Sequence, residues 1–212
     1  MGTASAIRGN VSTGRRISSA WSAAGSLSRW WAAVLAAVAC GAVVDAGRRV
    51  DDAALHPAGA AALITVIVLT GAAAIVDLHE HRIPNRLLAW SASAVVAATV
   101  WLAAADGFGG RGRHRLAAVA AGALAAGVPM MVVRLQRGLG MGDVKLAVVL
   151  GGAAGLVHPL LAAATVFGAA LGAGLYGVLR QRTRLALGPW LWGAWALSLT
   201  AVLTHAALGG RF

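Results

Sequence analysis

The residues best suited to chemistry are the few carboxylates of a chain that is otherwise strongly apolar. Only seven of its 212 residues are Asp or Glu, whereas 59% are hydrophobic. Asp143 follows three glycines in the segment GLGMGDVKL, and Asp77 opens the segment DLHEHRIPNRL. Each acid stands where a long apolar run meets a glycine- or proline-containing junction. An acid at the edge of a membrane segment is costly and marks a candidate site for proton transfer or ion binding.

The elements that must position these acids are apolar runs of about the length that crosses a bilayer, roughly 20 residues. Mean hydropathy is +0.76, and alternation typical of strands is absent. We therefore expect an all-α polytopic membrane bundle of six to seven transmembrane helices, rich in the Ala and Gly that allow close helix contact. The candidate spans are Trp30–Val44, Ala58–Val76, Leu87–Ala105, Leu116–Val133, Leu146–Val157, Pro159–Leu179 and Leu185–Thr204.

Two segments follow from this pattern: a basic, disordered tail at 1–29 and a transmembrane domain at 30–212. With seven spans, the tail shares a side with the loops that follow Asp77, Val133 and Leu179, and that side carries about twice as many Arg and Lys residues as the other. Such a bias predicts a cytoplasmic N-terminus. The net charge of +11 is explained by topology and anionic headgroups, so we expect no nucleic-acid partner.

The local sequence predicts a backbone break near each acid. Pro84 cannot continue a helix from Asp77 but suits the first turn of the next one, and it biases Ile83 toward extended geometry. The break is therefore expected just after Asp77. Gly140 and Gly142 would let the chain approach another backbone closely. The short fifth run is expected to begin its helix near Gly142 or Asp143, on the same membrane face as Asp77.

Taken together, the two motifs resemble the signature of prepilin peptidases, the type IV leader peptidases, which are membrane aspartic proteases. The pattern D-x5-I-P-N is matched by Asp77, Ile83, Pro84 and Asn85, and G-x-G-D-x-K is matched by Gly140, Gly142, Asp143 and Lys145. A late glycine-proline-aromatic feature is partly matched by Gly188, Pro189 and Trp190. The resemblance covers about residues 58–194 and is closest to the short tight-adherence (Flp) peptidases. Paired cysteines of the longer, N-methylating members are missing, because Cys40 is the only cysteine.

The resemblance implies an intramembrane aspartic endopeptidase without metal or cofactor. Its substrate would be a prepilin or pseudopilin with a basic leader, and its partners would be membrane lipids and pilus assembly machinery. It would work at the cytoplasmic border of the inner (plasma) membrane. Asp77 and Asp143 would share one proton and titrate as a unit, which leaves the acid and base roles open. The backbone around Gly140 and Gly142 would open to receive an extended peptide.

Other roles stay open for several neighbours of the acids. Lys145 could lower the pKa of Asp143 or extend to headgroups, and Asn85 could satisfy backbone groups freed at the break. His79, Glu80 and His81 resemble a metal cluster, but polar loop residues fit them better, since no other cytoplasmic His or Cys completes a shell.

Two other functions would also account for acids in a membrane bundle. A small proton- or cation-coupled transporter would place acids at mid-span and show an internal repeat, and neither is present. A catalytically inactive scaffold of a pilus machine would keep both motifs.

Overall fold

The computed structural model describes residues 56–80, 82–136, 139–180 and 186–207. These residues contain six α-helices and no strand. The prediction of an all-α fold is confirmed. The described residues belong to one unit, Leu35–Phe212, and the predicted tail 1–29 and span Trp30–Val44 lie outside them. The helices are α3 (Pro57–Glu80), α4 (Asn85–Ala105), α5 (Gly110–Leu135), α6 (Met141–Gly155), α7 (Leu160–Arg180) and α8 (Gly188–Ala207).

Helices α3, α4, α5 and α7 are long and apolar enough to cross a bilayer. The chain is thus a multi-pass membrane protein. Helix α8 has the length, at 20 residues, but its tryptophans and glycines make it less apolar. Helix α6 has only 15 residues, which corresponds to roughly 22 Å at helical rise, less than the thickness of a hydrocarbon core.

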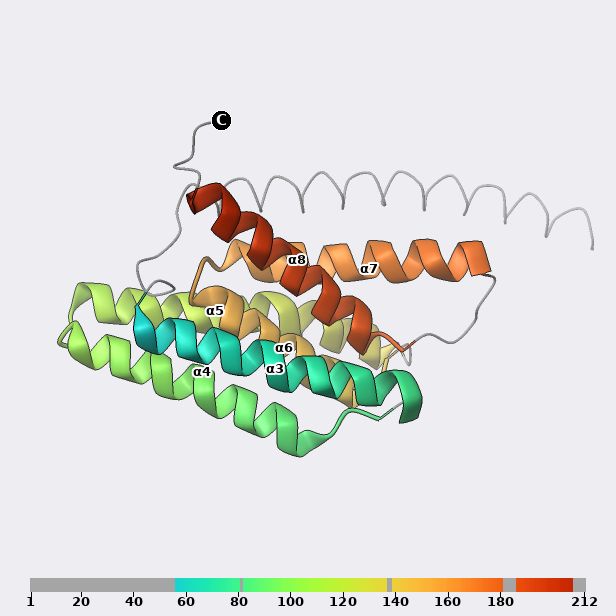
Figure 1. The fold of residues 1–212 in the computed structure, drawn as a ribbon, viewed down its shortest axis with the longest axis horizontal. Coiled ribbons are helices and arrows are strands. Elements are labelled where there is room, and N and C mark those ends of the chain that lie inside the picture. Colours follow the sequence, from blue (N-terminus) through green and yellow to red (C-terminus); the bar gives the residue numbers. More distant parts are fainter. Residues whose placement is uncertain (1–55, 81, 137–138, 181–185, 208–212) are drawn as a thin grey trace, which may run out of the picture. The chain divides into compact units, whose positions relative to one another are not determined.

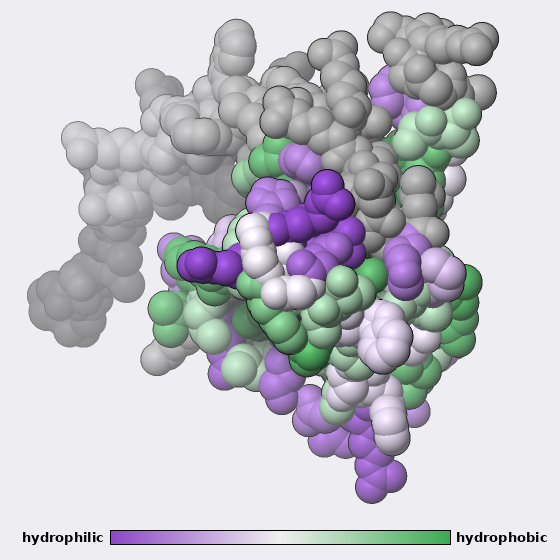
Figure 2. Space-filling model, turned by 90° about the vertical axis from the view of Figure 1, so that its left-hand side faces the viewer, coloured by the Kyte–Doolittle hydropathy of each residue, from purple (hydrophilic) through white to green (hydrophobic). Residues whose placement is uncertain are grey.

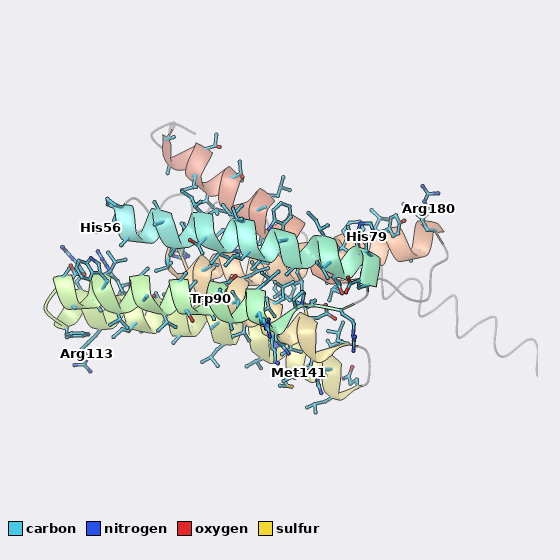
Figure 3. The ribbon with its side chains drawn as sticks, turned by 60° about the horizontal axis from the view of Figure 1, so that its bottom comes forward. His56, His79, Trp90, Arg113, Met141 and Arg180 are labelled. Atoms are coloured by element: carbon cyan, nitrogen blue, oxygen red, sulfur yellow. The ribbon has the colours of Figure 1, made fainter. Side chains whose placement is uncertain are left out.

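Successive helices run in opposite directions, so the α3–α4, α5–α6 and α7–α8 junctions all lie at one end of the bundle, on the right in Figure 1. In Figure 3, His79, Met141 and Arg180 mark this end, whereas His56 and Arg113 mark the opposite one. After the first motif the chain therefore leaves this end through α4 and returns to it through α5. The two motifs are brought to one end by this topology.

The opposite end is closed by a tight turn between α4 and α5. Gly107 has a positive φ of 74°, its N–H donates to the Ala104 carbonyl, and the Phe108 N–H donates to the Ala103 carbonyl. This pairing is the Schellman motif that ends many helices. Arg111 and Arg113, at the start of α5, are exposed, and Figure 3 shows Arg113 at this end. Figure 2 looks onto the same end, where hydrophilic side chains lie among hydrophobic ones.

The most extensive helix–helix contact is between α5 and α6. Gly122 of α5 faces Gly151 and Gly155 of α6, and a Cβ added to any of the three would overlap the backbone of the other helix. Such small residues let helix backbones approach closely in a bilayer. From Val144 onward α6 is mostly buried, so the helix that carries Asp143 in its first turn is anchored in the bundle.

Candidate active site

Asp77 lies in the last turn of α3 and is buried, with 6% of its surface exposed. The helix continues to Glu80, so the break comes one turn later than the sequence suggested. The reason is that Pro84 restricts only Ile83 and its own N–H, which leaves residues 78–80 free to stay helical. The extra turn sets Asp77 back from the exposed end of α3, where His79 and Glu80 face outward.

The break itself is an extended segment that ends at Pro84. Pro84 has φ −66° and ψ 115° and is the residue before α4, so it caps the helix instead of occupying its first turn. Ile83 packs against the start of α6, where a Cβ on Gly142 would lie 3.0 Å from the Ile83 Cβ. Gly142 thus gives close contact with a side chain of the break, not with its backbone as expected from sequence.

Asp143 is the third residue of α6, and Gly140 is the N-cap. The Asp143 carboxylate accepts a hydrogen bond from the Gly140 backbone N–H, the geometry of one half of a capping box. Burial, and to a smaller extent the charge of Asp77, raise the pKa of Asp143, and the hydrogen bond from the Gly140 N–H lowers it; the net result is a pKa of about 6. The two carboxyl groups are therefore close enough to influence each other's ionisation.

Both acids line one open cavity of about 320 Å³. Since a water occupies about 30 Å³ in the liquid, this volume admits several waters. The cavity brings together the two motifs, although they are about sixty residues apart in sequence. Its lining consists of Asp77, Arg82, Ile83, Asn85, Gly140, Met141, Gly142, Asp143 and Lys145.

Lys145 is exposed, and its ammonium Nζ donates to the Asn85 Oδ1 at 3.0 Å. The partner that the structure gives Lys145 is thus an amide oxygen, and Lys145 is not among the causes of the raised pKa of Asp143. In this contact the Asn85 carbonyl oxygen is the acceptor. The pair joins the first turn of α4 to the first turn of α6 at the edge of the cavity.

The late glycine-proline pair lies at the start of α8. The buried Gly188 donates its backbone N–H to the Asp77 Oδ2 at 3.2 Å. Pro189 follows in the first turn of α8 and does not line the cavity. The structure therefore brings Gly188 into contact with one of the two acids.

Sequence reasoning did not select Arg82 and Met141, which also line the cavity. Their position inside the two motifs, between Asp77 and Ile83 and between Gly140 and Gly142, was the available signal. Among the residues the structure describes, no three His, Cys, Asp or Glu side chains gather in a way that could hold a metal ion. His81 of the suspected cluster lies outside those residues.

A sequence model of the type IV leader peptidase family matches residues 61–178, more than half of the chain. The chain belongs to the type IV leader peptidase family. The members of this family are proteases. The matched region contains every residue that lines the cavity. Gly188 lies beyond the matched region. No curated protein and no solved structure is significantly similar to the chain.

Proposed function

We propose that the protein is an intramembrane aspartic endopeptidase that removes the leader peptide from type IV, Flp-like prepilins or pseudopilins. The observation that carries this proposal is the shared cavity: Asp77 and Asp143 lie on different helices yet line the same space. The raised pKa of Asp143, partly caused by the charge of Asp77, is what a proton-sharing acid pair requires. Family membership independently supports a protease.

Peptide hydrolysis by the pair needs one ionised and one protonated carboxyl group. The carboxylate takes a proton from water as the water oxygen bonds to the peptide carbonyl carbon, while the carboxylic acid gives its proton to the carbonyl oxygen. The tetrahedral intermediate then collapses and the C–N bond breaks. The leaving nitrogen receives the proton that was taken from water, and the intermediate's hydroxyl returns its proton to the other carboxylate as the C=O bond re-forms. Protons and charges balance, and both carboxyl groups return to their starting sum of one proton.

The location of the cavity suits a substrate that is itself a membrane helix. Asp77 lies one turn inside the end of α3, so a substrate helix could remain in the bilayer while its leader extends past the helix ends. The junctions at this end carry Arg82, Arg86, Arg134, Lys145 and Arg180, a bias that favours the cytoplasmic side. We assign the site to the cytoplasmic border of the plasma membrane on this basis, with pilus assembly machinery as the downstream partner.

Coexpression with a Flp-type prepilin tests the proposal. The wild-type protein should convert the precursor to a shorter form, and mass spectrometry should place the new N-terminus after the leader. Asp77→Asn and Asp143→Asn should each abolish conversion, while Glu80→Gln, an exposed acid on the same helix end as Asp77, should not. Conversion that persists in both Asp variants would refute the enzyme assignment.

The same experiment separates the alternatives. An inactive scaffold would leave the precursor intact in the wild type but would still support pilus assembly when an active peptidase is supplied. A proton- or cation-coupled transporter would leave the precursor intact and would show ion flux in proteoliposomes that depends on the same two acids.

A further inference from the structure

The first turn of α8 touches Asp77 through a residue that has no side chain. The Gly188 N–H donates to the Asp77 Oδ2 at 3.2 Å, and a Cβ on Gly188 would lie 2.7 Å from that same oxygen. Real Cβ atoms do not approach an oxygen this closely, so any side chain at position 188 would displace the Asp77 carboxylate or the helix. The backbone N–H would be present with any residue except proline, but the space for the carboxylate depends on glycine.

Helix α8 is fixed at this position by two tryptophans that pack against glycines of the neighbouring helices. Trp192 lies on Gly71 of α3, where an added Cβ would be 3.3 Å from the indole ring, and its Nε1 donates to the Ile67 carbonyl at 3.2 Å. Trp190 lies on Gly172 of α7, where an added Cβ would be 2.7 Å from the ring.

The bond from Trp192 to Ile67 is informative because it uses a carbonyl of α3, the helix that carries Asp77. A tryptophan at a membrane interface would ordinarily direct its N–H toward headgroups. Here the N–H is instead directed into the bundle, and it sets the position of α8 along α3 between Ile67 and Asp77. Figure 1 shows α8 crossing α3 obliquely, with its first turn at the end of α3 that bears the site.

We propose that Gly188 is a positioning residue for Asp77 and that Trp192 holds α8 in the register that lets Gly188 act. This inference rests on the proposed peptidase function. Without the N–H donor and the vacant Cβ position, the Asp77 carboxylate would rotate away from the geometry in which it faces Asp143 across the cavity. A misplacement of about 1 Å at a reacting group can lower turnover by roughly 10²-fold.

The test uses the purified full-length protein in detergent micelles and a prepilin that the wild type cleaves. Gly188→Ala should lower kcat by roughly 30- to 100-fold while KM changes less than about threefold, because substrate binding elsewhere is unaffected. The matched control is Gly193→Ala, since a Cβ on this α8 glycine meets nothing within 4 Å. Gly193→Ala should leave kcat and KM within about twofold of wild type, because the added methyl group meets no neighbouring atom. A folded Gly188→Ala variant that turns over like Gly193→Ala overturns the proposal.

If Gly188→Ala does not fold, Trp192→Phe decides, because it removes the N–H donor and keeps most of the ring. It should lower kcat at least fivefold with little change in KM, whereas Trp101→Phe on α4, where the indole is 65% exposed, should not. Equal kcat in the two Phe variants overturns the proposal. A different result would refute the proposed peptidase function itself: prepilin cleavage that persists in both Asp77→Asn and Asp143→Asn.

Discussion

Replacing Asp143 with Asn should stabilise the protein at neutral pH while abolishing its activity. Burial and the charge of Asp77 raise the pKa of Asp143 from 3.8 to about 6 in the folded protein. An acid whose pKa is higher in the folded than in the unfolded state binds its proton more tightly when folded. The stabilisation from that proton is complete below pH 3.8 and is lost as the pH rises through about 6. Asn has no charge to lose and keeps a carbonyl oxygen for the Gly140 N–H.

The shift of about two pH units corresponds to roughly 3 kcal/mol at 1.36 kcal/mol per unit. Because Asp143 is only partly buried, solvent screening lowers the expected gain to about 1–1.5 kcal/mol, by analogy with partly exposed ion pairs. For a chain of this size that is roughly 2–5 °C in Tm. The assay is thermal unfolding in detergent micelles between pH 4 and pH 8. The difference between Asp143→Asn and wild type should grow with pH and level off above about pH 7.

Asp106→Asn is the matched control, because Asp106 is mostly buried but pairs with the Arg115 Nε at 3.2 Å. Losing this pair should destabilise the protein at pH 8, the opposite sign. A Tm for Asp143→Asn that is unchanged or lower at pH 8, or a gain equally large at pH 4, would refute the electrostatic reasoning.

Three further predictions concern other contacts of the cavity and of the bundle. Asn85→Ala and Lys145→Met should each reduce prepilin cleavage, and a double-mutant cycle should show that the double variant loses little more than either single one, since both remove one hydrogen bond. Gly142→Leu should reduce cleavage strongly, because the added side chain would displace the segment between α3 and α4, and normal cleavage would contradict the proposed role of this glycine in admitting a peptide. Gly151→Ala should lower the Tm because its Cβ would overlap the backbone of α5, whereas Gly152→Ala, whose nearest neighbours lie 3.8 Å away, should not.

Much of the fold was predictable because it depends on local sequence. Uninterrupted apolar runs defined five long helices and one short helix, since each needs only length and hydropathy to be recognised. The early start of α6, at Met141, was also expected from the shortness of its apolar run. The α3 boundary was missed by one turn, because a proline restricts the residue before it and not the four residues before that.

The common location of Asp77 and Asp143 could be expected from sequence only through topology and family resemblance. Neither source gives the contacts that orient the acids. The partner of Lys145 was not predicted, because a lysine two residues from an acid can reach many acceptors and the choice depends on where α4 begins. The partner of Asp77 was not predicted either, since Gly188 is 111 residues away and contributes a backbone N–H that no residue type reveals.

A short, mostly buried helix beside a long one brings the two acids to one cavity in this bundle. Helix α3, with 24 residues, spans the bundle and presents Asp77 from within its last turn. Helix α6, with 15 residues, is shorter, and the Asp143 in its first turn lines the same cavity as Asp77. Burying Asp143 in this way costs stability, as its raised pKa indicates. The backbone contact of α6 with α5 through Gly122, Gly151 and Gly155 can offset that cost, since it keeps α6 in place without adding polar groups to the cavity.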